Sequence, residues 1–331
     1  MHVLIFGAAG MIGRKLTQHL AQRGRLGNRE IASLGLVDVV SAERPAQFGG
    51  EVTVSTLDIA DPGAAERSIA ARPDVIFHLA AIVSGEAEDD FEKGYRINLD
   101  GTRHILEVVR REAMKSPYRP RLVFASSIAV FGAPFPDAIG DEFFTTPLTS
   151  YGTQKAMSEL LISDYTRRGF LDGIALRLPT ICIRPGKPNK AASGFFSNIL
   201  REPLAGQAAV LPVAETVRHW HASPRAAVGF LTHAATMELS PLGARRALTL
   251  PGLSATVAEQ IEALRRVAGE KAVRLIRREP DPVIIKIVDG WPRAFDARRA
   301  LSLGFRADNS FDDIIRIHVE DELGGRSPVL Q

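Results

Sequence analysis

Residues 3–13 of the chain read VLIFGAAGMIG, and this stretch decides the fold class. Its first part, residues 3–6, is continuously apolar, which is typical of a strand buried on both faces of a parallel sheet. The glycines that follow are spaced for a tight turn, and residues 12–23 have the apolar periodicity of a helix. The sequence therefore predicts a strand, a glycine turn and a helix in immediate succession.

The glycine turn has the form of a phosphate-binding loop. Gly7, Gly10 and Gly13 give the spacing G-x-x-G-x-x-G, and Met11 and Ile12 lie at the start of the helix. Small residues let backbone N–H groups approach a pyrophosphate, and the helix presents its positive N-terminal end to that charge. A glycine-rich turn without a ligand would have the same composition, but its position between a strand and a helix favours dinucleotide binding. We expect these five residues to contact a dinucleotide.

The alternation of strand and helix continues through the first half of the chain. Further strands are expected at residues 34–37, 52–57, 75–79, 122–125 and 174–178, and further helices at residues 62–71 and 91–113. Such alternation favours parallel strands joined by right-handed helical crossovers. We therefore predict an α/β fold with a Rossmann-type, doubly wound parallel sheet.

The composition changes after residue 178. Prolines and glycines become frequent there, which suggests irregular segments built onto the sheet, while residues 256–268 and 311–323 have helical periodicity. We divide the chain into a dinucleotide-binding domain, residues 1–178, and a smaller C-terminal substrate-binding lid. The lid is expected to comprise residues 179–221 and 251–331, with residues 222–250 returning to the first domain.

The composition also excludes several classes of protein. Of 331 residues, 45% are hydrophobic and 24% are charged, which fits a globular protein rather than a disordered or fibrous one. A formal net charge of +3 is too small and too scattered to indicate a nucleic-acid partner. No apolar run of about 18 residues occurs, so no membrane span is expected. The single cysteine, Cys182, and the lack of a signal peptide predict a cytoplasmic protein.

Several positions are placed to contact the rest of a dinucleotide. Asp38 ends the second expected strand, where an acid binds the adenosine ribose and repels the 2′-phosphate of NADP; the alternative is a loop or helix-cap aspartate. Asp58 and Ile59 follow the third strand and are expected to meet the adenine. Small side chains follow the fourth strand and leave room for the nicotinamide half: Leu79, Ala80 and Ala81. These residues predict NAD as the cofactor.

Tyr151 and Lys155 bring a phenol and an ammonium to one face of a helix, because residues four apart lie one turn apart. A tyrosine titrates near 10, so a base acting near pH 7 needs a pKa lower by about three units, a stabilisation of roughly 4 kcal/mol. The lysine ammonium and the positive nicotinamide of NAD⁺ can supply it. The pair therefore indicates a general base, although exposed Tyr–Lys pairs also occur on ordinary helices.

Two further positions complete the candidate catalytic set. Ser126 and Ser127 end the fifth strand, at the carboxyl edge where open α/β sheets bind ligands, so a hydroxyl there can hydrogen-bond the reacting oxygen. Asn98 lies near the start of the helix after the fourth strand, where it could hold a water that relays protons from Lys155. The alternative for Asn98 is a helix cap.

In this order, these residues resemble those of the extended short-chain dehydrogenases/reductases, in the NAD-dependent epimerase/dehydratase family. The resemblance covers residues 1–180 well and the remainder loosely. It implies that Tyr151 removes a hydroxyl proton as hydride passes to NAD⁺, and that Lys155 binds the nicotinamide ribose and lowers the tyrosine pKa. The family serine precedes x-x-V-Y-G, and Ser127 matches this pattern with Phe131 in place of tyrosine. The resemblance also implies a homodimer.

Departures from the family pattern narrow the substrate. Sugar-nucleotide dehydratases carry Thr-Asp-Glu at the serine step, whereas Ser127 is followed by Ile128 and Ala129, so dehydration is not expected. Nucleotide-sugar epimerases have an asparagine where this chain has Thr180, and a V-Y-G-P turn that is replaced here by a different proline-glycine turn. Both differences weaken the case for a nucleotide-bearing substrate.

The lid offers groups that suit a small acid. A carboxylate needs a fixed cation, and its other oxygens need hydroxyl partners. Lys187, Ser193 and Arg218 lie in a polar region of the lid, although each could equally be a solvated surface residue. We expect them to bind substrate together with Thr180 and with the catalytic hydroxyls of the first domain.

Residues 178–197 resemble those of one branch of the family. This resemblance implies NAD-dependent oxidation of the 2-hydroxyl of a small sugar acid. One alternative is a nucleotide-sugar epimerase, in which the cofactor is reduced and reoxidised in each cycle. Another is a protein that senses NAD(H) without catalysis. No metal site is expected.

Overall fold

The computed structural model describes residues 1–186 and 192–329. It contains two compact units. The first comprises residues 1–130, 147–178 and 228–249, and the second comprises residues 131–146, 179–227 and 250–331. Residues 131–146, which the sequence-based division left within residues 1–178, therefore cluster with the second unit.

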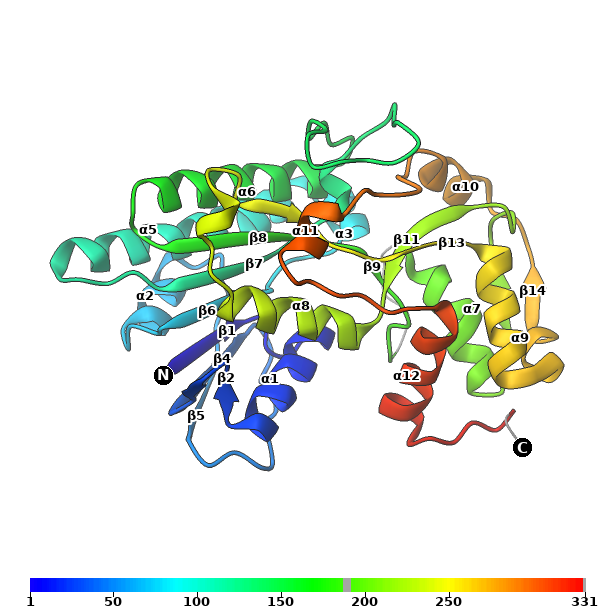
Figure 1. Cartoon of the computed structure of the whole chain (residues 1–331), viewed down its shortest axis with the longest axis horizontal. Coiled ribbons are helices and arrows are strands. Elements are labelled where there is room, and N and C mark those ends of the chain that lie inside the picture. The colour runs from blue at the N-terminus through cyan, green and yellow to red at the C-terminus, as the bar shows by residue number, and fades with distance from the viewer. Residues whose placement is uncertain (187–191, 330–331) are drawn as a thin grey trace. The chain divides into compact units, whose positions relative to one another are not determined.

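A seven-stranded parallel sheet forms the centre of the first unit (Figure 1). Its strands, in the order β12-β8-β7-β6-β1-β4-β5, are β12 (Ala247–Thr249), β8 (Asp172–Leu178), β7 (Arg121–Ser127), β6 (Val75–His78), β1 (His2–Phe6), β4 (Ser33–Asp38) and β5 (Glu51–Thr56). Each neighbouring pair is parallel. The prediction of a Rossmann-type parallel sheet is confirmed, and all six strands expected from the sequence belong to it.

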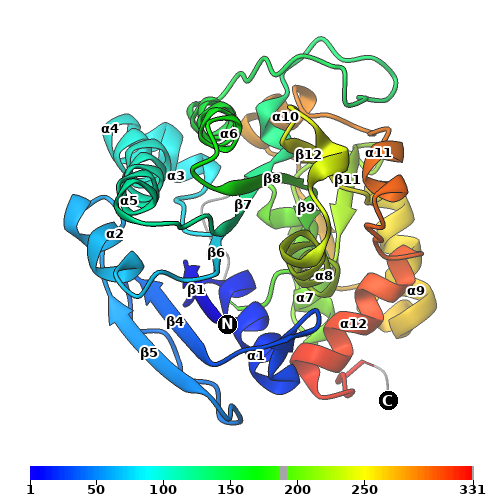
Figure 2. The same cartoon turned by 60° about the vertical axis from the view of Figure 1, so that its left-hand side comes forward.

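Helices cover both faces of this sheet (Figure 2). One face carries α2 (Pro62–Ile69), α5 (Gly101–Lys115) and α6 (Ser150–Arg167), and the other carries α1 (Met11–Arg23) and, from residue 228 on, α8 (Pro224–Thr236). Leu4 and Phe6 of β1 belong to the same buried cluster as Ile105 of α5 and Ile162 of α6. Short elements complete the unit: β2 (Arg25–Leu26), β3 (Arg29–Glu30), α3 (Ser84–Asp89), a 3₁₀ turn (Ile128–Val130) and another (Ser240–Leu242).

The order of strands reverses between β1 and β6. From β1 the chain winds outward to β4 and β5, then returns to β6 and winds in the opposite direction. The carboxyl ends of the two strands lie together, and the Leu79 N–H donates a hydrogen bond to the Phe6 carbonyl at 2.9 Å. Ligands of doubly wound folds bind at such a reversal, so the fold places the glycine loop and residues 79–81 where a dinucleotide would lie.

The prediction of a single helix over residues 91–113 is wrong. The structure has α4 (Phe91–Gly94), a π-helical turn (Tyr95–Asp100) and then α5. A π-helical turn inserts extra backbone into a helix, and such turns are frequent at functional sites. Apolar periodicity could not reveal it, because the buried positions on either side continue the pattern of one helix.

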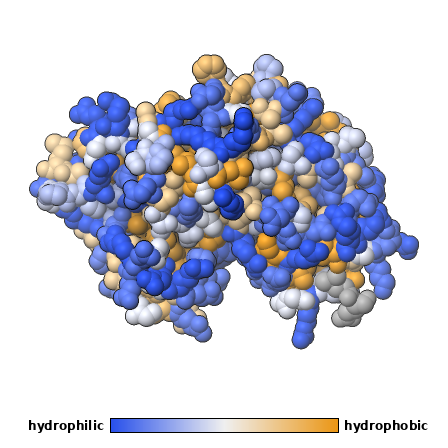
Figure 3. Space-filling view, viewed as in Figure 1, coloured by the Kyte–Doolittle hydropathy of each residue, from blue (hydrophilic) through white to orange (hydrophobic). Residues whose placement is uncertain are grey.

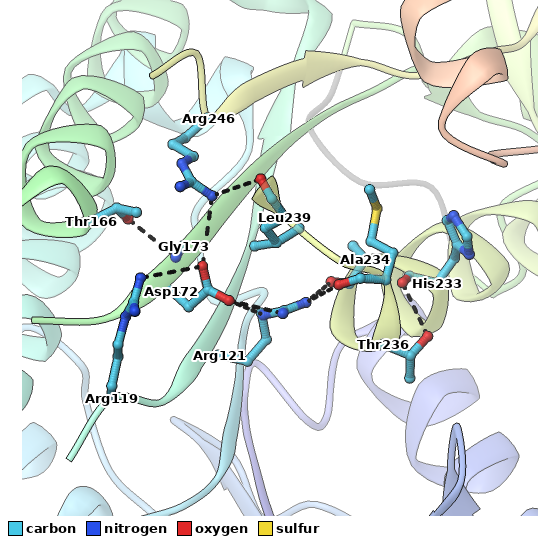
Figure 4. A network of polar contacts seen from close by, with 11 residues as sticks. Arg119, Arg121, Thr166, Asp172, Gly173, His233, Ala234, Thr236, Leu239 and Arg246 are labelled. Carbon is cyan, nitrogen blue, oxygen red and sulfur yellow. Dashed lines mark hydrogen bonds and ion pairs between the residues drawn. The ribbon is translucent and has the colours of Figure 1, made fainter. Parts of the chain in front are cut away.

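An ionic network fastens the amino edge of the sheet (Figure 4). Arg121, the first residue of β7, bonds the Asp172 carboxylate at the start of β8 at 2.9 and 3.2 Å. Its Nη1 donates to the carbonyls of Ala234 and Met237, at 2.8 and 3.0 Å, where α8 ends. Arg246 lies 3.6 Å from the same carboxylate. The arginine thus satisfies carbonyls at a helix C-terminus and ties α8 to two strands.

The second unit contains more regular structure than we expect from its prolines. It has a sheet of β13 (Leu253–Thr256), β11 (Arg218–Ala222) and β9 (Thr180–Ile181), a pair of β10 (Ala209–Leu211) and β14 (Ile276–Arg278), and five helices among its described residues: α7 (Gly194–Leu204), α9 (Val257–Val273), α10 (Pro282–Asp289), α11 (Arg298–Ser302) and α12 (Phe311–Leu323). The expectation of irregular segments is wrong because prolines are tolerated in the first turn of a helix: Pro224 opens α8 and Pro282 opens α10.

The hydropathy of the helices and of the surface agrees with the absence of long apolar runs in the sequence. None of the helices in residues 1–186 and 192–329 is long and apolar enough to cross a membrane. On the face drawn in Figure 3, hydrophilic residues predominate and hydrophobic residues occur in small groups.

Candidate active site

The glycine loop joins β1 to α1, and the surrounding backbone leaves no room for a side chain at Gly7 or Gly13. Gly7 has a φ of 85°, and a Cβ on it would lie 2.6 Å from the backbone nitrogen of Ala80. A Cβ on Gly13 would lie 2.1 Å from the carbonyl oxygen of Gly7. Gly10 precedes the first turn of α1 and has no side chain that could accept hydrogen bonds from the N–H groups of that turn. These N–H groups can therefore face an anion. These features fit the pyrophosphate of NAD.

Asp38 is fixed beside this loop. Its carboxylate ends β4 and accepts hydrogen bonds from the N–H groups of Ala9, at 2.9 Å, and Val39, at 2.7 Å. Met11 and Ile12 open α1 directly after the loop. An acid held next to a phosphate-binding turn is suited to hydrogen-bond ribose hydroxyls.

The two residues expected at the adenine differ in their surroundings. The Asp58 carboxylate accepts a hydrogen bond from the Ala60 N–H at 2.9 Å and lies 3.5 Å from Arg96. The Ile59 side chain is buried in the core of the first unit, where a Cβ on Gly101 would lie 2.9 Å from it. A contact of Ile59 with a ligand would therefore have to come from its backbone.

Tyr151 and Lys155 lie one turn apart at the start of α6. Thr149 caps this helix by accepting a hydrogen bond from the Gly152 N–H at 3.1 Å. The Lys155 Nζ is 5.7 Å from the centre of the Tyr151 ring and donates to the carbonyl of Ala125 at 2.8 Å. Lys155 is only 2% exposed, and this burial lowers its pKa from 10.5 to about 7, against a smaller opposing effect of a nearby carboxylate. The ammonium is thus costly to keep charged.

The Lys155→Met variant should lose part of the pH dependence of folding stability. In the wild type, the unfolded state binds more protons than the folded state between pH 7 and 10.5, because the folded pKa of Lys155 is about 7. Through this group the free energy of unfolding should rise by about 2 kcal/mol from about pH 7 to about pH 9, and the variant should lack that rise. Denaturant unfolding of the cofactor-free proteins measures it. An equal rise in both proteins would contradict the lowered pKa.

The two serines at the end of β7 have different partners. The Ser127 Oγ is partly exposed and accepts a hydrogen bond from the Ala129 N–H at 3.1 Å. The Ser126 side chain is buried and donates to a carboxylate oxygen of Glu159 at 2.5 Å. Its hydrogen is therefore committed inside the protein, which makes Ser127 the better placed of the two to meet a ligand.

Asn98 lies in the π-helical turn, and its side chain is bonded at both ends. Its Oδ1 accepts from the Ile82 N–H at 2.9 Å, and its Nδ2 donates to the Gln154 Oε1 at 2.8 Å. Gln154 is fully buried and directly precedes Lys155. We did not single out Gln154 from the sequence, although its place inside the Tyr–Lys spacing could have drawn attention to it.

His78 was also missed from the sequence. It ends β6 and is buried against Phe124, and its Nε2 lies 2.8 Å from the Thr102 Oγ1. Because Thr102 donates its own hydrogen to the Asn98 carbonyl at 2.8 Å, the His78 Nε2 must be the donor. Burial, with the Lys155 charge, lowers the His78 pKa to about 3, so this imidazole is neutral at pH 7.

The predicted lid residues belong to the second unit. The Thr180 Oγ1 is 2.7 Å from the His219 Nε2, and the other ring nitrogen is 2.9 Å from the Pro292 carbonyl. A carbonyl can only accept, so the His219 Nδ1 carries the hydrogen and Thr180 donates to Nε2. The threonine oxygen can therefore still accept a hydrogen bond from a ligand.

The other lid residues have partners of their own. The Ser193 Oγ accepts from Arg184 at 2.9 Å. Arg218 donates to the Ser254 carbonyl at 3.0 Å and pairs with Glu259 at 3.3 Å. Lys187 lies outside the described residues. Within residues 1–186 and 192–329, no group of three or more His, Cys, Asp and Glu side chains could hold a metal ion.

Comparisons with known proteins show which family the chain resembles and which proteins are similar to it over most of their length. Residues 3–231 match the NAD dependent epimerase/dehydratase family. Two relatives, from Cupriavidus necator and Haemophilus influenzae, are named D-erythronate dehydrogenase. The first is 48% identical over 97% of this chain and 98% of its own length, and the second is 43% identical over 98% and 100%.

A solved structure bears a different name. The nucleoside-diphosphate-sugar epimerase from Agrobacterium tumefaciens is 65% identical to this chain. It superposes with a TM-score of 0.96 and covers 98% of this chain and 95% of its own. The names of similar proteins therefore point to two different substrates.

Proposed function

The chain belongs to the NAD-dependent epimerase/dehydratase family, and on that premise we propose that it oxidises the 2-hydroxyl of D-erythronate, giving 2-oxo-D-erythronate. The observation that carries the proposal is the set of Tyr151, Lys155 and Ser127 on α6 and β7, in a unit whose glycine loop fits NAD. The near full-length identity to two proteins named D-erythronate dehydrogenase supports the choice of substrate.

The proposed mechanism uses one base and three supporting groups. When bound, NAD⁺ supplies the acceptor for the hydride that leaves C2 of the substrate. The Tyr151 phenolate takes the hydroxyl proton, and the Lys155 ammonium stabilises the phenolate and binds the nicotinamide ribose. Ser127 orients the substrate oxygen. Asn98 is proposed to complete a proton relay, and its bonds to Ile82 and Gln154 hold it in place for that role.

Binding of the rest of the substrate is a further part of the proposal. Thr180 and Ser193 are proposed to bind its hydroxyl groups, with Ser126 as an additional neighbour. Lys187 or Arg218 is proposed to bind its carboxylate. The lone pairs that Thr180 retains support the first of these roles, because an alcohol can donate a hydrogen bond to them.

The purified protein should reduce NAD⁺ when D-erythronate is added, with net accumulation of NADH. Because the Asp38 carboxylate would repel a 2′-phosphate, kcat/KM with NADP⁺ should be lower by at least about tenfold. Absorbance of the reduced cofactor measures both. If NAD⁺ were reduced at the same rate without D-erythronate, D-erythronate would not be the substrate.

A second candidate function rests on the name of the Agrobacterium tumefaciens structure. A nucleotide-sugar epimerase would retain NAD tightly, show no net reduction and bind a nucleotide handle. Calorimetric titration with a uridine diphosphate sugar tests it, and micromolar binding would favour it. Inactivity toward a broad panel of hydroxy acids and sugar nucleotides would instead favour a protein that senses NAD(H).

We also propose a cytoplasmic homodimer. Cys182 is the only cysteine and is buried, which fits a reducing compartment. Met114 on α5 and Leu160 on α6 are 70% and 69% exposed, which supports association through these two helices. Light scattering of the purified protein tests the dimer.

A further inference from the structure

Helix α6 carries a third polar residue on the face of Tyr151 and Lys155, and the proposed mechanism does not use it. Glu159 follows Lys155 by one turn and is only 4% exposed. Its carboxylate accepts hydrogen bonds from the Arg177 Nη2 at 2.7 Å and Nε at 3.0 and 3.1 Å. It also accepts the bond from Ser126 described above. Arg177, on β8, is itself buried.

This arrangement joins α6 to two strands at one point. Ser126 and Arg177 are register partners on the neighbouring strands β7 and β8. Glu159 binds both, and Ser126 is the residue before Ser127. A buried ion pair is weak evidence for added stability, because desolvation offsets the attraction between the charges. The hydrogen bonds from Nε and Nη2 of Arg177 to Glu159 are directional, however, so they specify one position of α6 on the sheet.

Glu159 also acts on the charge of Lys155. The groups that face the Lys155 ammonium are the Tyr151 ring and Glu159 from α6, the Ala125 carbonyl and Phe124 ring from β7, and neutral His78 from β6. Within residues 1–186 and 192–329, no carboxylate forms an ion pair with Lys155. Glu159 is the charge that raises the pKa of Lys155 against the larger effect of burial.

We infer that Glu159 is a positioning residue for the reaction: held by Arg177 and Ser126, it sets α6 on the sheet and keeps the Lys155 ammonium charged. One test of this inference, the pH profile of kcat, rests on the proposed dehydrogenase function. The other test, the titration of Lys155, does not, because it needs neither substrate nor cofactor.

The direct test is the titration of Lys155 in Glu159→Gln. The chain has only eight lysines, so NMR can resolve their signals when the side-chain nitrogen is isotopically labelled. The signal that disappears in Lys155→Arg is that of Lys155. The Lys155 midpoint should move to lower pH by about one unit in Glu159→Gln. Glu159→Asp, which keeps the charge, should restore most of the midpoint. The matched control is Asp164→Asn, which removes a carboxylate from an exposed pair with Arg167 on the same helix and should leave the midpoint unchanged.

A double variant separates the charge from the fold. Glu159→Gln alone removes the carboxylate that binds the buried Arg177 guanidinium, which destabilises the protein. Combining it with Arg177→Met removes both charges, so the free energy of unfolding should recover while the Lys155 midpoint stays low. If both quantities recover in the double variant, or if the midpoint does not move in folded Glu159→Gln, the inference is wrong.

With D-erythronate and NAD⁺, the same change should appear in the pH profile. The alkaline limb of kcat should move to lower pH in Glu159→Gln, because Lys155 loses its proton earlier and no longer stabilises the phenolate. At about pH 8 this predicts a roughly tenfold lower kcat. If the wild type does not oxidise D-erythronate, the proposed function fails, and the NMR midpoint still decides the role of Glu159.

Discussion

Tyr151→Phe should lower kcat for NAD⁺ reduction by about a thousandfold or more, because the variant retains the ring and lacks the proton acceptor. The phenylalanine ring can occupy the same place, 5.7 Å from the Lys155 Nζ, so the fold and the affinity for NADH should change little. Steady-state rates with D-erythronate and a fluorescence titration with NADH measure the two quantities.

The matched control for this variant is Tyr165→Phe. Tyr165 lies on the same helix and donates its hydroxyl hydrogen to Glu107. The control removes the same atom from α6 at a position away from Lys155, and kcat should remain near that of the wild type. A rate for Tyr151→Phe within about tenfold of the wild type would exclude this tyrosine as the base.

Gly13→Ala should weaken NADH binding by about a hundredfold, equivalent to nearly 3 kcal/mol. The added Cβ would lie 2.1 Å from the Gly7 carbonyl oxygen and 2.8 Å from the Ala8 Cα. Both are backbone atoms and cannot rotate away, so the loop must move from the first turn of α1, where the phosphate would bind. Fluorescence titration with NADH measures the loss.

Gly229→Ala controls for the change of glycine to alanine. Gly229 is an exposed residue of α8, and nothing lies within 4 Å of a Cβ built on it. Alanine there should leave NADH binding unchanged and stabilise the helix by up to about 1 kcal/mol. If Gly13→Ala bound NADH as well as this control, the glycine loop would not be the phosphate site.

The first half of the chain could be predicted because its strands are buried on both faces. Continuous apolar runs such as residues 3–6 and residues 75–79 admit few other interpretations when helical stretches alternate with them. The family resemblance stated from residues 1–180 is confirmed by the match over residues 3–231. The assignments of individual site residues remain predictions.

The surroundings of the site residues could not be predicted, because they depend on contacts between residues far apart in the sequence. The spacing of Lys155 and Glu159 alone would indicate an exposed pair on a helix surface. Glu159 is instead buried against Arg177, a strand residue 18 positions further on, and only the packing of α6 on β8 brings the two together. The hydrogen bonds of the Asn98 side chain could not be predicted for the same reason, because its partners Ile82 and Gln154 lie 16 and 56 residues away.

The seventh strand of the sheet has a consequence for dissecting the protein. β12 pairs with β8 through Ala247, Leu248 and Thr249, after the chain has passed through residues 179–227. A truncation at residue 178 would therefore expose the hydrogen-bonding groups along β8, and an open edge of this kind recruits other chains and promotes aggregation. The nucleotide-binding unit is therefore not contiguous in the chain, and a fragment that ends at residue 178 should aggregate more readily than the whole protein.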